Sequence, residues 1–281
     1  MPELPEVEIA RRSLERWLVG RPIARASATP GKPLRGLTPA EVSRALSGRT
    51  VRRVERRGKH LLWDLGAGQG AHLHLGMTGK LVRREGKEPA PPYARVSLDL
   101  SDGSRVHLVD PRRFGRFELG PLDALRASPT LRELGPDAWD EAPTAELLRE
   151  RLAGSRREIK VSLLDQRRIA GLGNIQASES LFRARLSPFA RADELSPADW
   201  RRLAKGIHDA LSYALGAEGK GARDRDIRYV EEPGAPNPFL VYGRAGEPCP
   251  RCGGPIRQEV QRQRSTYLCP VCQPGPAPGK R

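Results

Sequence analysis

Four cysteines near the C-terminus have the spacing of a metal site. They form two Cys-x2-Cys pairs separated by sixteen residues: Cys249, Cys252, Cys269 and Cys272. In each pair the short spacing lets a tight turn bring two sulfurs together, and a tetrahedral Zn2+ can then join the two turns. The pattern therefore predicts one structural zinc ion bound by four thiolates. Four incidental free thiols are the alternative.

The N-terminal segment PELPEVE, residues 2–8, could supply a nucleophile. A small second residue usually permits removal of Met1, which would leave Pro2 as a secondary amine. Because an α-amino group titrates near ~8, well below a lysine, part of it is unprotonated near neutral pH. Nucleophilic attack that expels a leaving group also needs an acid, and Glu3 is the adjacent carboxyl. Ordinary capping of a helix by a Pro- and Glu-rich start is the alternative.

The charge of the chain points to an anionic partner. Lys plus Arg number 49 against 34 Asp plus Glu, so the net charge is +15 over 281 residues. Such a surplus favours a polyanion, usually DNA or RNA, over a merely solvated basic surface. No apolar stretch approaches the ~20 residues of a membrane span, and the acidic N-terminus lacks the pattern of a signal peptide. We therefore expect a cytoplasmic protein whose cysteines stay reduced and can bind metal.

The N-terminal half must position the proline. Apolar residues recur at helical spacing over residues 5–19, which predicts an amphipathic helix. Residues 51–119 instead alternate like strands, with candidates at 51–56, 60–65 and 71–75 and a hairpin signal at Asp102-Gly103. An all-β sandwich with one N-terminal helix fits this half.

The period becomes helical after about residue 125. Segments at 147–152, 156–166 and 174–185 are expected to be helices. A further helix opens at Ser196-Pro197-Ala198-Asp199, where a cap precedes a proline and an acidic residue. From Gly216 to Pro238 the chain is rich in glycine, proline and charge, which predicts a long mobile loop.

The cysteine pairs enclose a predicted β-hairpin. PIRQEV (255–260) and STYL (265–268) could be its strands, with residues 261–264 at the tip. A basic tip on a rigid hairpin suits a nucleic-acid groove, although a zinc ribbon without a DNA role is the alternative. The tail after Cys272 is expected to be disordered.

Five motifs occur in order along the chain. They are PELPEVE at 2–8, HLGMTG at 74–79, DPRRFG at 110–115, GLGNI at 171–175 followed by ASES at 177–180, and the four-cysteine site. Together they closely resemble the bacterial formamidopyrimidine-DNA glycosylases, which are 8-oxoguanine glycosylase/AP lyases. The resemblance spans nearly the whole chain and implies a base-excision-repair enzyme that acts on damaged double-stranded DNA.

The resemblance also implies an α+β multidomain fold. The expected parts are an N-terminal catalytic β-sandwich with its N-terminal helix at 1–125, a helical helix–two-turns–helix domain at 126–240 with a lesion-recognition loop near 217–238, a four-cysteine zinc finger at 241–273, and a disordered tail at 274–281. One structural Zn2+ is expected. We expect a monomer that is cytoplasmic and associated with the nucleoid.

The catalytic residues implied by the resemblance are Pro2, Glu3, Lys59 and Arg264. Pro2 would attack C1′, expel the base and form an iminium, and Glu3 would assist opening of the sugar ring. Two eliminations would then leave a one-nucleotide gap. Lys59 and Arg264 would contact phosphates beside the lesion, and Glu6 would support the start of the helix.

The implied DNA-binding residues fall into two groups. Met77, Arg112 and Phe114 would fill the hole left by an everted base, since excision requires the nucleotide to leave the stack. The others match family positions that bind DNA: His74, Lys160, Asn174 and Tyr242. From the residues alone, a buried structural role is the alternative for His74, Met77 and Phe114.

One segment departs from the family. The lesion-recognition loop usually has Gly-Gly followed by Ser or Thr, whereas residues 219–226 here contain neither Ser nor Thr. Preference for 8-oxoguanine is therefore less well supported than chemistry at the sugar. Two further hypotheses are an endonuclease VIII-like glycosylase for oxidised pyrimidines, which Leu4, Arg112 and Phe114 disfavour, and a non-catalytic lesion-binding protein.

Overall fold

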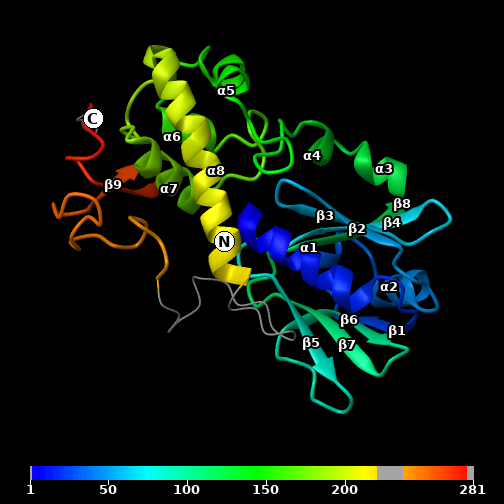
Figure 1. Cartoon of the computed structure of the whole chain (residues 1–281). Coiled ribbons are helices and arrows are strands. Elements are labelled where there is room, and N and C mark those ends of the chain that lie inside the picture. The colour runs from blue at the N-terminus through cyan, green and yellow to red at the C-terminus, as the bar shows by residue number, and fades with distance from the viewer. Residues whose placement is uncertain (1, 220–236, 277–281) are drawn as a thin grey trace. The chain divides into compact units, whose positions relative to one another are not determined.

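The computed structural model describes residues 2–219 and 237–276, apart from the side chains of 217–219. It contains two compact units, one built mainly from residues up to Glu133 and the other beginning at Leu134 (Figure 1). We call them unit 1 and unit 2. None of the described helices is long and apolar enough to span a bilayer.

Unit 1 has two four-stranded antiparallel sheets. The first runs in the order β1 (Ile23–Ala28), β6 (Ala94–Leu100), β7 (Ser104–Val109) and β5 (Lys80–Glu85). The second runs in the order β2 (Arg53–Arg57), β3 (His60–Asp64), β4 (Gln69–His74) and β8 (Arg116–Pro121). The expected strands at 51–56, 60–65 and 71–75 correspond to β2, β3 and β4, and Asp102-Gly103 lies in the β6–β7 hairpin.

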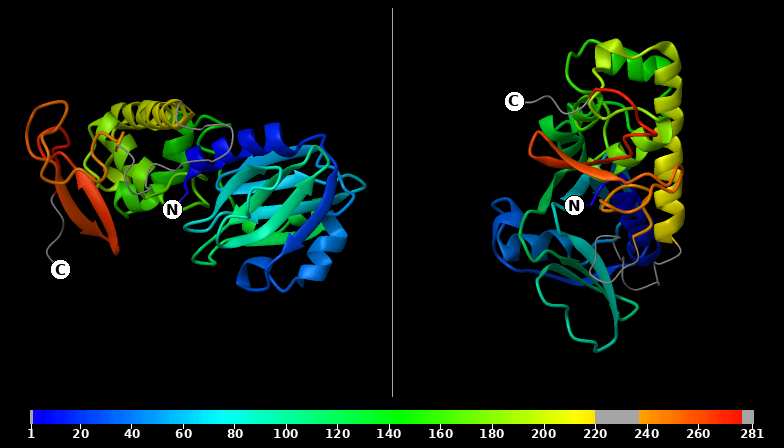
Figure 2. Two further views of the ribbon diagram at one scale, coloured as in Figure 1. Left: turned by 90° about the horizontal axis from the view of Figure 1, so that it is seen from below. Right: turned by 90° about the vertical axis from the view of Figure 1, so that its left-hand side faces the viewer.

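Helix α1 (Leu4–Leu18) packs against β2, β3 and β5, and thus against both sheets (Figure 2). Ala10, Leu14 and Leu18 are fully buried on it, as their helical spacing predicts. Inside the second sheet, the ring of Trp63 meets Phe117 edge-on, with centroids 5.7 Å apart. The helix that begins just after Pro2 is therefore fixed to a well-packed scaffold.

The expectation of a single helix in this half is wrong. Unit 1 also has η1 (Lys32–Leu34), α2 (Pro39–Leu46), α3 (Leu122–Arg126) and α4 (Pro129–Arg132). Helix α2 starts with a capping box, in which Thr38 accepts from the Glu41 amide and the Glu41 carboxylate accepts from Thr38. This box satisfies donors that a helix start otherwise leaves unpaired.

Unit 2 is mainly helical and ends in a hairpin. Its elements are α5 (Ala145–Leu152), α6 (Ile159–Leu163), α7 (Asn174–Ala184), η2 (Ala192–Glu194), α8 (Pro197–Gly219), β9 (Arg257–Gln261) and β10 (Arg264–Leu268). Helix α6 is shorter than the expected 156–166. Gly206 of α8 lies against the Ser180 backbone of α7, where a Cβ would be only 2.5 Å from the carbonyl oxygen, so the two helices approach closely.

The expected loop from Gly216 begins too early. Helix α8 continues to Gly219, because one interior glycine costs a helix only about 1 kcal/mol. The lesion-recognition loop lies mostly outside the described residues, as do residues 277–281 of the tail. Residues 274–276 are described, and the Ser187 hydroxyl donates to the Pro276 carbonyl at 3.3 Å.

Candidate functional site

The start of α1 places Pro2 and Glu3 in a buried environment. Pro2 is buried, and Glu3, the N-cap residue, is only 2% exposed. The Glu3 amide donates to Glu6 Oε2 at 2.9 Å, so the Glu6 carboxylate satisfies the first free amide of the helix. Through this hydrogen bond, Glu6 holds the backbone that carries the Pro2 amine and the Glu3 carboxyl, which is consistent with the supporting role predicted for it.

The same helix also fixes the turn that carries Lys59. Arg56 Nε donates to Glu8 Oε2 of α1 at 3.1 Å, and Arg56 Nη1 donates to the Gly58 carbonyl at 3.1 Å. Although burial raises the pKa of Glu8, hydrogen bonds from Arg11 and Arg12 and the charge of Arg56 bring it below its ordinary value. Glu8 is therefore an anion that connects α1 to the β2–β3 turn, where Lys59 is 8% exposed.

Asp110 joins the two loops predicted to enter DNA. Its Oδ2 accepts from the Gly115 amide at 2.7 Å, and its Oδ1 accepts from the Thr78 hydroxyl at 3.0 Å. Its own carbonyl accepts from Arg95 Nε at 2.9 Å. A completely buried carboxylate thus fixes the loop after β4 to the loop after β7.

These loops expose their large side chains. Met77 is 41% exposed and Phe114 is 53% exposed, whereas most large apolar residues of unit 1 are buried. The Arg112 guanidinium lies 5.0 Å from the centre of the Phe114 ring. Gly76, at φ +65°, allows the loops to touch, since a Cβ there would lie 2.4 Å from the Phe114 carbonyl carbon. A buried core role for Met77 and Phe114 is excluded by this exposure.

Three histidines form a cluster on the second sheet. His72 Nδ1 lies 2.8 Å from Glu118 Oε2, and its Nε2 lies 2.9 Å from His60 Nδ1. If His72 Nδ1–H donates to the Glu118 carboxylate, then His72 Nε2 is an acceptor and His60 Nδ1–H donates to it. The rings of His60 and His74 lie 4.7 Å apart.

Burial keeps two of these rings neutral. Burial, followed by the charge of Lys59, lowers the pKa of His74 to about 4. Burial, followed by the nearby His74, lowers the pKa of His60 to about 2. Because the Gly76 amide donates to His74 Nδ1 at 3.1 Å, the remaining proton of His74 is on Nε2. Neutral His74 can therefore act as a hydrogen-bond donor through Nε2.

In unit 2, strand β10 gathers two of the predicted DNA-binding residues. Lys160 Nζ donates to the Ser265 carbonyl at 2.9 Å and to Thr266 Oγ1 at 2.7 Å. Asn174 Nδ2 donates to the same Ser265 carbonyl at 2.9 Å. Lys160 is 1% exposed, so the geometry does not support direct contact of its ammonium with DNA. Lys160 instead fixes the strand whose first residue is Arg264.

Glu179 anchors the segment that carries Tyr242. Its carboxylate accepts from the backbone amides of Leu240, Val241 and Tyr242 at 2.9–3.1 Å, and Arg183 donates to it at 2.6 Å. The Tyr242 ring packs on Tyr267 of β10, with centroids 4.9 Å apart. Sequence analysis assigned no role to Glu179 beyond its place in the ASES motif, since the backbone amides that it binds lie 61 to 63 residues away.

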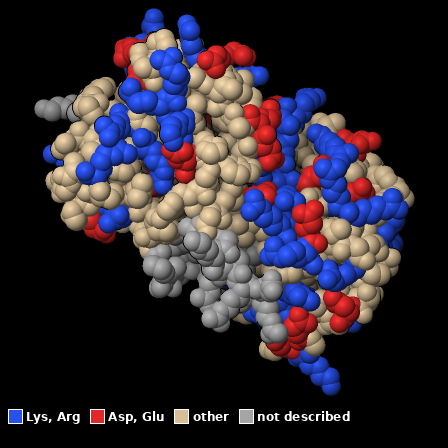
Figure 3. Space-filling model, viewed as in Figure 1, with Lys and Arg blue, Asp and Glu red and all other residues tan. Residues whose placement is uncertain are grey.

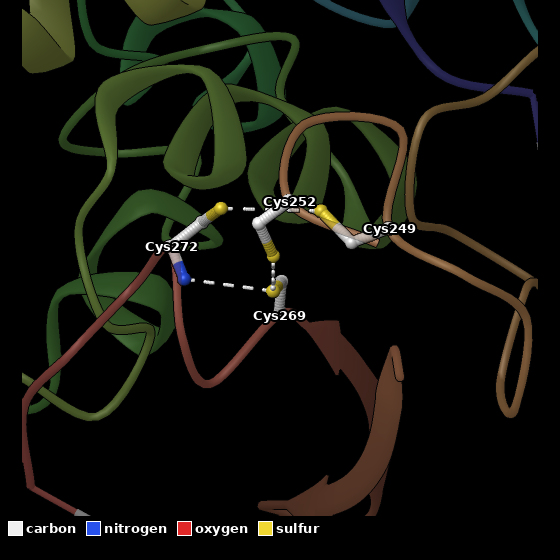
Figure 4. Close-up of side chains that lie close together, drawn as sticks. All are labelled: Cys249, Cys252, Cys269 and Cys272. Carbon is white, nitrogen blue, oxygen red and sulfur yellow. Dashed lines mark hydrogen bonds between the residues drawn. The ribbon is translucent and has the colours of Figure 1, made fainter. Parts of the chain in front are cut away.

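The four cysteines converge as predicted (Figure 4). Their sulfurs all lie within 4.8 Å of one another. Backbone amides of Arg251 and Cys272 point at the sulfurs of Cys249 and Cys269, at 3.4 and 3.5 Å. Four thiolates at these separations fit one tetrahedral structural Zn2+. The ion would link the segment before β9 to the segment after β10.

The hairpin between the cysteine pairs matches the prediction. Strands β9 and β10 are joined by Arg262 and Gln263, both with positive φ, as a two-residue hairpin turn requires. Arg264 follows and is exposed.

Lys and Arg side chains cover much of the face drawn in Figure 3, with Asp and Glu scattered among them.

The site residues therefore form two sets. Unit 1 holds Pro2, Glu3, Glu6, Lys59, His74, Met77, Arg112 and Phe114. Unit 2 holds Lys160, Asn174, Tyr242, Arg264 and the cysteines. Sequence reasoning missed the residues that position them: Glu8, Arg56, Asp110 and Glu179. Glu8, Asp110 and Glu179 lie within the quoted motifs, which was the available signal.

Comparison with known proteins gives the family. The Formamidopyrimidine-DNA glycosylase N-terminal domain matches residues 1–117, the Formamidopyrimidine-DNA glycosylase H2TH domain matches 134–226, and the zinc finger found in FPG and IleRS matches 246–275. The formamidopyrimidine-DNA glycosylase of Pelotomaculum thermopropionicum is 41% identical over 97% of this chain and 99% of its own length. That of Burkholderia thailandensis is 42% identical over 97% of this chain and its full length.

Solved structures agree with this assignment. The Lactococcus lactis Fpg bound to abasic-site DNA has a TM-score of 0.86 and 30% identity, over 98% of this chain and all of that one. The Fpg protein of Thermus thermophilus has a TM-score of 0.81 and 38% identity over the same shares. The chain belongs to the formamidopyrimidine-DNA glycosylase family. The expected α+β multidomain fold and single structural zinc are confirmed.

Proposed function

We propose that this protein is a bifunctional DNA glycosylase/AP lyase that removes oxidised purines, 8-oxoguanine and formamidopyrimidines, from duplex DNA. The observation that carries the proposal is the buried Pro2–Glu3 pair at the start of α1, with Lys59 fixed to the same helix through Glu8 and Arg56. The relatives support it, since they are named formamidopyrimidine-DNA glycosylases, and L. lactis Fpg has been solved on abasic and N7-benzyl-Fapy-dG DNA.

The chemistry follows from an amine beside an acid. The nitrogen of Pro2, freed of Met1, attacks C1′ as the bond from C1′ to the base breaks and the base leaves with a proton. Glu3 donates a proton to the ring oxygen, the sugar opens and an iminium forms. The iminium acidifies the C2′ protons, and transfer of one of them to the Glu3 carboxylate expels the 3′ phosphate. In the conjugated iminium that results, loss of the C4′ proton expels the 5′ phosphate. Water finally releases the sugar fragment from Pro2.

We propose that three side chains fill the space that the everted nucleotide leaves in the duplex: Met77, Arg112 and Phe114. Their exposure and the rigid Asp110 junction beneath them support this role. Arg112 has donors that can pair with the base opposite the lesion. Arg112→Ala should therefore mainly erode the preference for cytosine over adenine opposite 8-oxoguanine.

The remaining residues are proposed to contact DNA phosphates. Lys59, Arg264 and the first turn of α7 at Asn174 offer cationic or backbone donors, and His74 and Tyr242 offer neutral ones. Arg264→Ala should weaken binding to every duplex by a similar factor and reduce the salt slope by about 1. The assignment is wrong if Arg264→Ala shifts the cytosine/adenine ratio while Arg112→Ala leaves it unchanged.

The decisive test is trapping of the iminium. Borohydride should cross-link the wild-type protein covalently to abasic DNA, whereas Pro2→Gly should bind duplex without cross-linking or excising 8-oxoguanine. The matched control is Pro5→Ala, which changes the other proline of this segment and should retain trapping. A Pro2→Gly variant with wild-type excision would overturn the mechanism, and a wild-type protein that binds but never cross-links would indicate a non-catalytic lesion sensor.

The substrate needs a separate test, because residues 220–236 lie outside the described structure. Duplexes carrying 8-oxoguanine, a formamidopyrimidine or 5,6-dihydrouracil should be incised at different rates, with the two purine lesions preferred. Preference for dihydrouracil would instead favour the endonuclease VIII-like alternative.

We further propose that the enzyme acts as a monomer in the cytoplasm at the nucleoid. Sedimentation with and without DNA tests the monomer, and fluorescence imaging of a tagged copy tests the location.

A further inference from the structure

An arginine-lined cavity lies in unit 2 on the β9 side of the hairpin. Its volume is 740 Å³, and its walls are the segment before α6, helix α6 and the end of β9. A second cavity of 200 Å³ shares Arg157 and Arg262 with it and adds Arg264. The two cavities therefore adjoin, and we call them together the α6–β9 groove.

The groove carries a surplus of positive charge. Four arginines line the larger cavity, Arg156, Arg157, Arg168 and Arg262, against Glu158 and Asp165. Asp165 is already 3.7 Å from Arg168. Among the described residues, no carboxylate lies within ion-pair distance of the other three guanidiniums. Asp193, whose pKa is lowered by its hydrogen bond with Arg191, also interacts with the charge of Arg156. The arginines of the cavity still outnumber its carboxylates, and such a surplus attracts an anion; guanidiniums suit phosphate in particular.

Both walls of the groove have fixed backbone. On one wall the Arg157 amide donates to Ser155 Oγ at 3.2 Å, and the Arg157 carbonyl accepts from the Ala192 amide at 3.0 Å. On the other wall Gln261 Nε2 donates to the Pro188 carbonyl at 3.1 Å, next to the tight turn at Arg262. The guanidiniums therefore project from a rigid frame, which lowers the entropic cost of binding.

The lining favours a phosphate backbone over a base. Phe189, the one aromatic residue of the larger cavity, is 5% exposed, so it offers no face on which a base could stack. Guanidiniums placed along two adjoining cavities instead match the repeated charges of a polynucleotide strand. The groove reaches Arg264, which is itself proposed to contact a phosphate near the lesion.

We propose that the α6–β9 groove binds phosphates of the DNA that flanks the lesion, continuing the backbone path beyond Arg264. The inference rests on the proposed function. It assigns to Arg156, Arg157 and Arg262 a role in duplex affinity and none in base excision. Long duplexes should therefore bind more tightly than duplexes too short to reach the groove.

The test compares short and long 8-oxoguanine duplexes, about 10 and about 30 base pairs, at several salt concentrations. The double variant Arg156→Gln/Arg157→Gln should lose affinity for the long duplex on the order of tenfold, with a salt slope lower by about 2. Its affinity for the short duplex and its single-turnover excision rate should equal those of the wild type. The matched control, Arg149→Gln/Arg151→Gln on the exposed surface of α5, removes the same charge outside the groove.

Each outcome is decisive. If the groove variant and the control behave alike on both duplexes, the groove does not bind flanking DNA. If the groove variant weakens both duplexes equally, its arginines act near the lesion and the proposal is wrong. Failure of the proposed function would appear differently, as wild-type protein that neither excises nor cross-links on either duplex.

Discussion

The two units position their site residues in different ways. In unit 1 the fixing contacts span between 3 and 48 residues of sequence: Glu6 to Glu3, Asp110 to Gly115, and Arg56 to Glu8. In unit 2 they join distant segments. Lys160 and Asn174 reach β10 across 91 to 106 residues, and Glu179 reaches the 240–242 backbone across 61 to 63.

Because of this difference, we expect the two units to respond differently to the loss of a single contact. The loops of unit 1 emerge from four-stranded sheets with their own apolar core, so one lost contact should have a local effect. The hairpin of unit 2 has only two strands of five residues each, and such a hairpin is marginal by itself in water. Its order must come from the zinc ion and from side chains of α6 and α7. The following predictions test that contrast.

Loss of zinc should have the largest effect, confined to unit 2. Cys249→Ser or chelation should release the ion and disorder the hairpin, because binding energy at such a site, about 10–16 kcal/mol in small zinc peptides, is folding energy. DNA affinity should fall at least about tenfold, given the lost phosphate contact of Arg264 and its neighbours. Hydrogen exchange should increase in β9 and β10 while β3 and β4 stay protected.

Restoration of zinc to chelated wild-type protein is the control and should recover both affinity and protection. Full DNA affinity in protein shown by metal analysis to lack zinc would contradict the prediction. Equal loss of protection in β3 and β4 would contradict the contrast between the units, because it would make unit 1 depend on the same ion.

Removal of the Asp110 carboxylate should have the next largest effect. Asp110→Ala leaves the Gly115 amide and the Thr78 hydroxyl without their acceptor in a buried place, which should cost about 3 kcal/mol of unfolding free energy. Excision of 8-oxoguanine should fall because the loops bearing Met77 and Phe114 loosen. Denaturant unfolding and single-turnover kinetics measure the two effects.

Asp110→Asn is the matched control, since it keeps one acceptor oxygen and the side-chain volume. It should lie between the wild type and Asp110→Ala in both measurements. If Asp110→Ala is as stable and as active as the wild type, the junction between the two loops does not position them.

The sequence predicted some elements well because their signals are local. Helix α1 and the zinc hairpin follow from apolar spacing and from cysteine spacing. Helix α2 was missed although Thr38-Pro39-Ala40-Glu41 carries the same kind of start signal as Ser196-Pro197-Ala198-Asp199, which did identify α8. The difference is length: α2 has eight residues, too few for a clear apolar period.

Other features could not be predicted, because their causes are non-local. Family resemblance named Lys160 as a DNA-binding residue, and only the fold shows its ammonium buried against β10. The roles of Arg56 and Glu179 depend on partners 48 and about 60 residues away. A single sequence contains both partners but does not indicate their proximity.

Lys160 offers a smaller and more specific test. Lys160→Met removes the donor to Ser265 and Thr266, and the loss should cost about 2 kcal/mol of unfolding free energy, since hydrogen bonds from charged groups contribute roughly 1.5–3. DNA affinity should fall through a loosened hairpin with the salt slope unchanged. Arg264→Gln should instead lower the slope by about 1. A lower slope in Lys160→Met would show that its ammonium contacts phosphate directly.

The histidine cluster of unit 1 predicts a pH dependence of stability. The unfolded chain takes up histidine protons near pH ~6.5. In the folded protein the pKa of His74 is about 4 and that of His60 about 2. Between pH 6.5 and 4 the unfolded state therefore binds more protons, so unfolding free energy falls as pH falls, by about 1.4 kcal/mol per pH unit for each histidine.

Replacement of His60 measures how much this one histidine contributes to the slope of unfolding free energy against pH. His60→Phe removes one titrating group from the cluster, so the slope of unfolding free energy between pH 6 and 5 should decrease by about 1.4 kcal/mol per pH unit. Above pH 7 both rings are neutral in both states, and the variant and the wild type should then differ by a constant amount. That constant difference is the control, because lost packing and the lost bond to His72 contribute to it at every pH. Urea unfolding followed by tryptophan fluorescence at several pH values provides both quantities. An unchanged slope in His60→Phe would mean that His60 takes up its proton equally in the folded and unfolded states, and that the cluster is not kept neutral by burial.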